Sequence, residues 1–522
     1  MSNLKNKIEN IFPDSFWDIP FEHRIEPLEQ TYFLGANGIT SHMKYGRYQK
    51  IFSPISVAGQ PVYLGKVPMM NEMMVNEIIA AQSKAWDDGN GQWPMMTHQQ
   101  RTACIRLFIE EMKKARKLVV LYIMWETCKS LKDSYAEFDR TVNYLTDTCN
   151  TFEKLVSNWE KKSKEGHLTF TLGHNAAGRV LSMGPSNYPL NETLQIVVPL
   201  LLTGNVVTIK PAKSGILLLE PIIKCFAKTL PNGVVTTLYG DGRKVISPVV
   251  SSGNLEFFAF IGGTWTADAI SKKIKNPHQV GSFKGLAAKN PLFGLKGANM
   301  DLLVKLAVDS SIRNNKGERC TATKKNYIDA EIYDEFIARC IVEFDNFKIG
   351  MPWEEGIDIP PLLPGSVSWL QKLLKDALDK GAKIANECGG MVNGGYMHPV
   401  LLVDVTEDMR IANEEQFGPI MFAFKMEGKE GLKKALHWVK TSGYGQQISI
   451  VASKELDHET VDYVVHQTTN QVCQVNINCT GKRYDNYPFS GRGLSGQDSI
   501  SLIEAILLAT FPYVTVVDES YE

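Results

Sequence analysis

Apolar side chains recur with two different spacings along this chain of 522 residues. Between residues 70 and 162 they return every three or four positions, which is the period of an α-helix. Helices are therefore predicted over the ranges 70–86, 94–114 and 117–162. Shorter runs rich in β-branched and aromatic residues predict strands at 51–57, 167–172 and 178–183. The first 60 residues otherwise follow no period and are expected to be irregular.

Predicted strands and helices alternate from residue 178 to residue 274. Strands are expected at 178–183, 206–209, 234–239 and 257–261, and helices at 191–203, 215–229, 243–252 and 265–274. This alternation is typical of a parallel, doubly wound sheet. The ligands of such sheets bind beyond the carboxyl ends of the strands. We therefore expect the turns at 184–189, 210–214 and 262–264 to lie on one rim.

A second α/β region is expected to begin near Asn290. Its predicted helices cover 333–347 and 368–380, and its predicted strands lie near 324–328, 400–403 and 419–424. The segment 513–517 near the end of the chain is rich in β-branched residues and predicts a further strand. Nothing after this strand could pair with it, so we expect it to extend a sheet, in this chain or in another subunit.

Composition narrows the class of protein. Hydrophobic residues make up 44% of the chain and charged residues 22%, which is typical of a globular protein. The net charge of −1 gives no broad basic surface, so a nucleic-acid partner is not expected. The nine cysteines show no paired spacing, which argues against disulfides or a zinc site and for a reducing compartment. The start lacks an apolar signal core, and the longest apolar run, 194–202, is too short to span a bilayer. A soluble cytoplasmic protein without a membrane or metal partner is expected.

Cys320 is a candidate nucleophile. Arg319 precedes it and two small residues, Thr321 and Ala322, follow it. A neighbouring cation favours the thiolate, which is the nucleophilic form of cysteine. A lone cysteine is more often a small buried apolar group than a catalyst, so the rest of a site must be found before this role is assigned.

Two of the rim turns carry groups that suit a phosphate. Lys210 follows a buried strand, and its ammonium can reach a phosphate or a ribose hydroxyl. Gly262, Gly263 and Thr264 precede a helix, where backbone N–H groups can approach a pyrophosphate. The turn at 262–264 has a simpler interpretation, because Gly-Gly-Thr is also an ordinary loop. Asn187, in the first turn, is likewise a common turn former.

Five motifs together resemble the aldehyde dehydrogenase superfamily in their order and spacing, from about residue 50 to 515. They are Asn187-Tyr188-Pro189, Lys210-Pro211, 260–264, Arg319-Cys320-Thr321 and 414–419. Within the superfamily the chain looks most like the NADP-dependent non-phosphorylating glyceraldehyde-3-phosphate dehydrogenases, on residues 138–141, 184–193, 350–356 and 475–478. The resemblance implies an α/β aldehyde dehydrogenase fold and a homodimer or homotetramer. It implies a Rossmann-like parallel-sheet cofactor domain (1–163 and 178–289), an α/β catalytic domain (290–475) and a small β oligomerisation element (164–177 and 476–522).

The resemblance also implies roles for individual residues. The Cys320 thiolate attacks an aldehyde, the side-chain amide of Asn187 and the backbone N–H of Cys320 stabilise the oxyanion, and hydride passes to NADP⁺. Lys210, Gly262, Gly263 and Thr264 bind the dinucleotide, and Glu415 and Phe417 contact its nicotinamide side. Lys213 stands where many NAD-using relatives carry a glutamate, so the cation favours NADP, although it could also be a solvated residue at a helix start.

The resemblance places an anionic substrate among cations. Arg140, Tyr188 and Arg319 fall on the positions that hold the phosphate of glyceraldehyde 3-phosphate. The last arginine of the subfamily lies in a loop that differs here: Lys482 takes its position and Arg483 lies beside it. The expected substrate is glyceraldehyde 3-phosphate or another small phosphorylated or acidic aldehyde.

Ala287 is the largest departure from the family pattern. The family carries a glutamate at this position, which activates water for thioester hydrolysis, and alanine cannot accept a proton. The chain could be an engineered Glu-to-Ala variant, since the flanking residues keep the family pattern. It could instead pass its acyl group to a thiol such as coenzyme A, as acylating members without this carboxylate do, or it could have lost catalysis and kept a binding role. The prediction is normal hydride transfer followed by slow release of the thioester.

Overall fold

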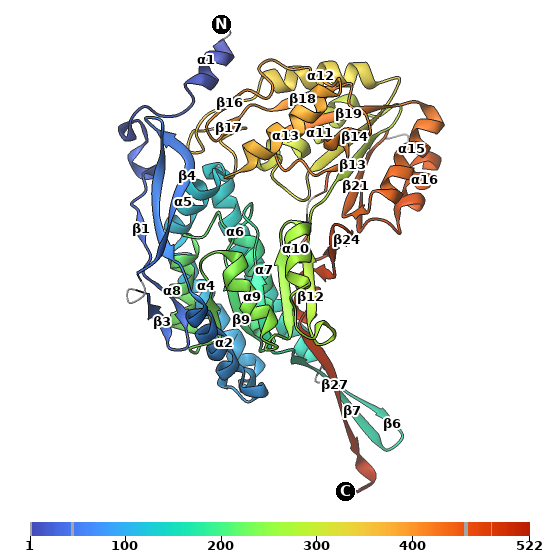
Figure 1. Cartoon of the computed structure of the whole chain (residues 1–522). Helices are drawn as coiled ribbons and strands as arrows, with labels where there is room; N and C mark the ends of the chain where they lie inside the picture. Colours follow the sequence, from blue (N-terminus) through green and yellow to red (C-terminus); the bar gives the residue numbers. More distant parts are fainter. Residues whose placement is uncertain (1–2, 43–45, 160, 454–457, 482, 522) are drawn as a thin grey trace.

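A six-stranded sheet forms the centre of the lower half of the molecule (Figure 1). The computed structural model describes residues 3–42, 46–159, 161–453, 458–481 and 483–521. The strand order is β10-β9-β8-β11-β12-β25, and all neighbours are parallel except β12 and β25. The strands are β8 (Arg179–Met183), β9 (Val206–Lys210), β10 (Val235–Thr237), β11 (Phe257–Ile261), β12 (Gly281–Gly285) and β25 (Gly496–Gln497). The predicted parallel sheet is therefore confirmed.

Helices surround this sheet. They are α2 (Glu72–Trp86), α4 (His98–Lys114), α5 (Arg116–Thr127), α6 (Leu131–Trp159), α7 (Asn191–Leu202), α8 (Leu219–Thr229), α9 (Gly242–Ser251) and α10 (Thr264–Ser271). The helix α7 is apolar on nearly every side, and all of its residues except Glu192 are buried. A helix without a polar face belongs in the interior of a protein, and α7 accordingly packs against α4, α6 and β9.

Two of the predicted helices are broken where a cap or a turn interrupts them. The prediction for 94–114 was too long, because Thr97 caps α4 and separates it from α3 (Gln92–Met95). The prediction for 117–162 was also wrong in joining α5 to α6. Cys128 adopts a left-handed backbone with φ 53° at the end of α5, which stops the helix there.

The helix predicted at 215–229 begins four residues later, at Leu219. The carboxylate of Glu126, on α5, accepts hydrogen bonds from the backbone N–H groups of residues 215–218, with donor-acceptor distances between 2.9 and 3.2 Å. These N–H groups are satisfied by a side chain from a distant segment rather than by a helix.

A seven-stranded sheet lies in the upper right of the molecule (Figure 1). Its order is β15-β18-β19-β14-β13-β21-β22, with only β15 antiparallel to its neighbour. The strands are β13 (Asn290–Gly294), β14 (Thr323–Asp329), β15 (Lys383–Ile384), β18 (Val400–Val403), β19 (Ile420–Met426), β21 (Gln447–Val451) and β22 (Gln474–Ile477). The helices of this region are α11 (Met300–Val308), α12 (Tyr333–Asp345), α13 (Ser366–Asp379), α14 (Arg410–Asn413), α15 (Gly428–Thr441) and α16 (His458–Thr468). The helix α17 (Leu502–Leu507) packs instead against α6 and α7 of the first region.

The N-terminal segment is more regular than the sequence predicted. It contains α1 (Asn3–Glu9), a hairpin of β2 (Tyr32–Gly35) and β3 (Gly38–Ser41), and a sheet of β1 (Leu28–Glu29), β4 (Tyr48–Val57) and β5 (Gln60–Pro68). The strand predicted at 51–57 lies within β4. Among the described residues, no helix combines the length and the apolar character needed to cross a bilayer.

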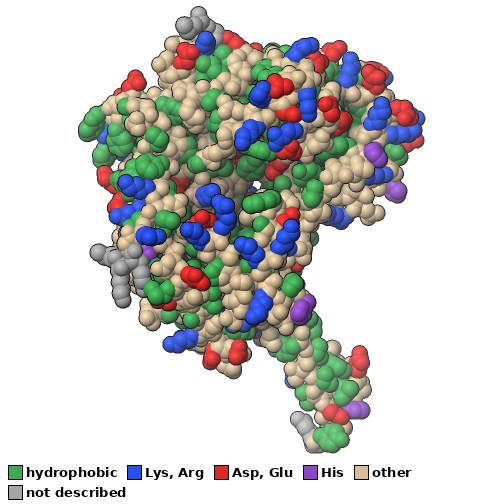
Figure 2. All heavy atoms as spheres, in the orientation of Figure 1, with side chains coloured by type: hydrophobic (Ala, Val, Ile, Leu, Met, Phe, Trp, Pro, Cys, Tyr) green, Lys and Arg blue, Asp and Glu red, His purple; other side chains and the backbone are tan. Residues whose placement is uncertain are grey.

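The C-terminal strand projects from the molecule as part of a three-stranded arm (Figure 1). Strand β27 (Thr510–Asp518) pairs antiparallel with β7 (Leu168–Ala176), which also pairs with β6 (Lys162–Glu165). The strand thus extends a sheet as expected, and the sheet belongs to its own chain. Phe511 and Val514 of β27 are exposed on this arm. Figure 2 shows hydrophobic side chains, in green, along the projecting arm.

Candidate active site

Two cavities meet at Cys320. The larger, of ≈ 790 Å³, is lined by residues that follow β8, β9 and β11, so the predicted rim of turns exists. The smaller, of ≈ 80 Å³, contains the side chains predicted to hold the substrate. Six residues border both cavities: Asn187, Glu192, Ile261, Gly285, Leu286 and Cys320. The thiol therefore lies between a space large enough for a dinucleotide and a space for a small molecule.

The loop before Cys320 holds three consecutive residues in the left-handed region, Asn315 (φ 51°), Lys316 (φ 58°) and Gly317 (φ 70°). Gly317 is required by space as well as by conformation, because a Cβ there would lie 2.4 Å from the Ser311 carbonyl oxygen. The buried Lys316 ammonium donates to the Thr127 carbonyl over 2.9 Å and thereby anchors the loop. Such backbone persists only where the surroundings hold it, and here it fixes the position of the thiol.

A residue that the sequence analysis missed binds the backbone carbonyl oxygens at and just after Cys320. The Asn290 amide donates to the carbonyl oxygens of Cys320, over 2.7 Å, and Ala322, over 3.0 Å. Asn290 is the first residue of β13, which lies beside β14 in the second sheet. The side-chain amide of Asn290 therefore ties the backbone at Cys320 to the start of β13 in the second sheet.

Burial controls the acidity of the thiol. Removal from water, followed by the negative charge of Glu192, raises the pKa of Cys320 to about 12. Arg319 lowers this pKa, but by less than burial and Glu192 raise it. The expectation that Arg319 would favour the thiolate is therefore outweighed. The Arg319 guanidinium instead donates to Thr321 Oγ1 over 2.9 Å.

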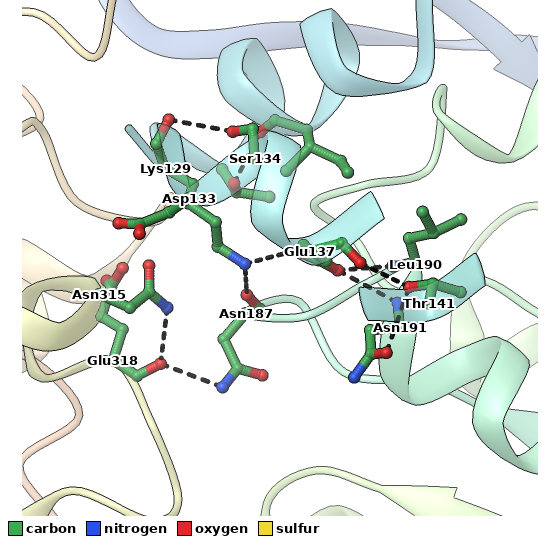
Figure 3. Close-up of polar contacts among 12 residues, drawn as sticks. Lys129, Asp133, Ser134, Glu137, Thr141, Asn187, Leu190, Asn191, Asn315 and Glu318 are labelled. Atoms are coloured by element: carbon green, nitrogen blue, oxygen red, sulfur yellow. Dashed lines mark hydrogen bonds and ion pairs between the residues drawn. The ribbon is translucent and has the colours of Figure 1, made fainter. Parts of the chain in front are cut away.

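Asn187 lies at the centre of a buried polar network (Figure 3). Its side-chain amide nitrogen donates to the Glu318 backbone carbonyl over 3.0 Å, and its backbone carbonyl accepts from the Lys129 ammonium over 2.8 Å. Lys129 also forms an ion pair with Glu137. The Glu137 carboxylate accepts hydrogen bonds from the backbone N–H groups of Leu190 and Asn191. The network fixes the Asn187 side chain at the border of both cavities, and the sequence analysis did not identify Lys129 or Glu137.

Two donors near the thiol are free to bind an oxyanion. The second N–H of the Asn187 amide and the backbone N–H of Cys320 make no hydrogen bond with any residue that the structure describes. Preplaced donors of this kind stabilise the negative oxygen that forms when a thiolate attacks a carbonyl.

The larger cavity contains most of the predicted dinucleotide ligands, namely Lys210, Lys213, Gly262, Gly263, Glu415 and Phe417. Lys210 is buried and donates to the Pro211 carbonyl over 2.7 Å. Burial, followed by repulsion from Lys213, lowers the pKa of Lys210 to about 8. Lys213 itself is exposed. Thr264 donates to the Leu494 carbonyl over 3.3 Å and does not line the cavity, whereas Thr266, which the sequence analysis missed, does.

The residues present fit a dinucleotide. Gly263 caps α10, and a Cβ there would meet no atom within 4 Å, so the backbone leaves room for a phosphate. Glu415 Oε1 is buried and accepts no hydrogen bond within the described part of the chain, which suits a ribose hydroxyl donor. Burial raises the pKa of Glu415, and Lys324 opposes this shift. Arg243 adds a third cation to the cavity wall that the sequence analysis did not identify.

The smaller cavity brings together Arg140, Tyr188, Arg319 and Arg483. Arg140 is already paired with Asp485 over 3.1 Å, which compensates part of its charge. Arg483 donates to Gln195 and lies over the Tyr144 ring, 5.2 Å from its centroid. Lys482 lies outside the described residues. The anion site predicted from sequence thus contains carboxylates as well as cations.

Ala287 borders the larger cavity together with Cys320 and offers no proton acceptor. A different carboxylate, which the sequence analysis missed, borders both cavities. Glu192 lies in the first turn of α7, and burial raises its pKa to about 7. Glu192 lies within the stretch 184–193 that carried the resemblance, but no role was assigned to it there, because an acidic residue at a helix start is commonplace.

The fold and the site define a Rossmann-type oxidoreductase with a cysteine placed between a dinucleotide cavity and a small-molecule cavity. The sequence model of the aldehyde dehydrogenase family matches residues 48–510, and the chain belongs to this family. The resemblance found in the sequence is thereby confirmed, as is the aldehyde dehydrogenase fold.

Individual relatives are distant but cover most of the chain. The NADP-dependent glyceraldehyde-3-phosphate dehydrogenase of Streptococcus equinus is 27% identical over 458 residues, which is 86% of this chain and 90% of the relative. The 2,5-dioxopentanoate dehydrogenase of Saccharolobus solfataricus is 28% identical, over 85% of this chain and 90% of the relative. The crystal structure of the NADP-dependent glyceraldehyde-3-phosphate dehydrogenase of Bacillus halodurans, complexed with NADP, is similar with a TM-score of 0.84 and 26% identity, over 94% of this chain and 100% of that chain.

Proposed function

We propose that this chain oxidises glyceraldehyde 3-phosphate, or a similar small acidic aldehyde, to its acid with NADP⁺, through a thioester on Cys320 that is released slowly. The observation that carries the proposal is the position of Cys320 at the junction of the two cavities. The cofactor and substrate named for the Streptococcus equinus and Bacillus halodurans relatives support it.

The residues at the junction would act in sequence. The Cys320 thiol loses its proton to solvent, the resulting thiolate attacks the aldehyde carbon, and the N–H groups of Asn187 and Cys320 stabilise the oxyanion. Lys210, Glu415 and the turn at Gly263 orient the dinucleotide, which supplies the hydride acceptor when bound. The thioester then needs a water molecule that has lost a proton, and Ala287 cannot take it. Release is therefore expected to be slower than hydride transfer.

The cations of the smaller cavity support an acidic substrate. Arg319 and Arg483 line it together with Arg140, and planar guanidinium groups suit a phosphate or carboxylate. The cavity also suits a small substrate, because its volume is only ≈ 80 Å³. The Saccharolobus solfataricus relative, which is named for an aldehyde that carries a carboxylate, supports the wider class of acidic aldehydes.

A rapid-mixing experiment tests the proposal. On mixing with NADP⁺ and glyceraldehyde 3-phosphate, the protein should produce about one NADPH per active site in a burst, followed by a slow steady phase, because acylation precedes a slower release. Cys320→Ala should abolish both phases and keep NADP binding. Binding of NADP without a burst on any small acidic aldehyde would contradict the proposal and indicate a silent binding protein. Steady turnover that requires added coenzyme A would indicate a thiol acceptor.

The preference for NADP is expected to depend on Lys213. Lys213→Glu should raise the Kd for NADP about 10- to 100-fold and change the Kd for NAD by less than about threefold, because only NADP carries the 2′-phosphate that the cation attracts. Fluorescence titration with both dinucleotides measures the two constants. Lys244→Glu is the matched control, since Lys244 is exposed nearby on α9 and does not line the cavity. Equal losses for NADP and NAD in Lys213→Glu would contradict the assignment.

A further inference from the structure

We propose that Glu192 is the general base that releases the thioester in this chain, at the step for which Ala287 supplies no base. The inference rests on the proposed function, because it concerns the second half of that reaction. It assigns a catalytic role to a residue that borders both cavities and to which the sequence analysis gave no role.

Glu192 is placed where a base for this step is needed. It is the only carboxylate that borders both cavities among the residues that the structure describes, and it shares both walls with Cys320 and Asn187. Its negative charge acts directly on the thiol, since it is the largest charge effect on Cys320. A water molecule between Glu192 and the acyl carbon would lie beside the same oxyanion donors that serve the first step.

The carboxyl group of Glu192 takes no part in the hydrogen bonds and ion pairs that hold the described structure together. It makes no hydrogen bond or ion pair with the described residues, and it is half-buried because it faces the cavities. Two buried glutamates, Glu137 and Glu126, differ in this respect. Glu137 accepts from Leu190, Asn191 and Lys129, and Glu126 accepts from four consecutive backbone N–H groups. A carboxylate that is left unpaired in a reactive cavity is available for proton transfer.

The charges around Glu192 tune it for that purpose. Burial raises its pKa to about 7, and Glu137 acts in the same direction. Arg483, Lys129 and Arg140 oppose the shift and keep the carboxylate accessible near neutral pH. A general base is most effective when its pKa lies near the working pH.

The step balances without another reactant. The Glu192 carboxylate takes one proton from water, and the water oxygen forms a bond to the thioester carbon. The resulting oxyanion is held by Asn187 and the Cys320 N–H. When it collapses, the carbon–sulfur bond breaks, the electron pair stays on the Cys320 sulfur, and the acid leaves. Glu192 then returns its proton to solvent.

The isosteric variant Glu192→Gln tests the assignment. Its NADPH burst should keep the amplitude of the parent, while the steady rate falls about 100-fold, which is the usual contribution of a general base. The acylated protein should accumulate and be visible as an added mass in intact-protein mass spectrometry. In the parent, the steady rate should rise from pH 6 to pH 8 with a midpoint near 7, because only the ionised carboxylate accepts a proton, and this rise should be absent in Glu192→Gln.

A second substitution separates catalysis from folding. Adding Ala287→Glu to Glu192→Gln restores a base at the other side of the thiol and should recover multiple turnover. Alkylation of Cys320 by iodoacetamide gives a readout without substrate: it should shift to lower pH in Glu192→Gln, because a charge that raises the thiol pKa is gone. An unchanged steady rate in Glu192→Gln overturns the inference, as does loss of the burst in both Glu192→Gln and Glu192→Asp. Failure of the proposed function itself looks different, because then the unaltered protein shows no burst.

Discussion

Ala287→Glu is expected to raise the steady rate of aldehyde oxidation about 10- to 100-fold while leaving the NADPH burst unchanged. The side chain would extend from a position that borders the larger cavity with Cys320, so its carboxylate could activate water at the thioester. Hydride transfer precedes this step and does not need the base. Stopped-flow absorbance of NADPH measures both phases in one experiment, and a panel of small aldehydes identifies the substrate at the same time.

Ala287→Gln controls for the added volume. Glutamine has nearly the shape of glutamate but cannot accept a proton at neutral pH, so its steady rate should stay at the parent level. A gain in both variants would mean that packing, rather than base chemistry, limits release. A fall of the burst in Ala287→Glu would mean that the carboxylate obstructs the dinucleotide, and would contradict the expected order of events.

Asn187→Ala is expected to slow the burst about 100- to 1,000-fold, which is the usual cost of removing one oxyanion donor. Asn187 is fixed by the Glu318 carbonyl and by Lys129, so its remaining N–H is held at the border of both cavities. The loss should appear in the rate constant of the burst and not in the Kd for NADP. Rapid mixing and fluorescence titration separate the two.

Asn299→Ala is the matched control for this change. Asn299 caps α11 through a hydrogen bond from the Leu302 N–H over 2.9 Å, far from the cavities. Its loss should cost about 1 kcal/mol of stability, which is the usual value of an N-cap, and leave the burst rate unchanged. A normal burst in Asn187→Ala would contradict the oxyanion role, whereas a similar loss in both variants would point to general destabilisation.

Local sequence predicted those elements whose boundaries depend on local residues. Strand β11 at Phe257–Ile261 and strand β18 at Val400–Val403 occur as predicted, because each is a short apolar run between residues that end a strand. The start of α8 could not be predicted, because Glu126 takes the backbone N–H groups of residues 215–218 from another part of the chain. The break between α5 and α6 was also not predictable from local sequence. The hydrophobic period continues across Cys128, and only the left-handed backbone of Cys128 ends the helix.

The sequence by itself determined the class of chemistry. The motifs around Asn187, Lys210, Cys320 and Glu415 indicated the family, and the identity of residue 287 led to the prediction that the usual base is absent, because these depend only on residue type and order. The tertiary structure decided how the groups interact. It pairs both Arg140 and Arg483 with Asp485. Burial and Glu192 raise the pKa of the Cys320 thiol by more than Arg319 lowers it. Glu192 also lines the same cavity as Cys320. Glu192 and Cys320 are more than a hundred residues apart in the chain, so only the folded structure could reveal that the cysteine shares both cavities with the Glu192 carboxylate.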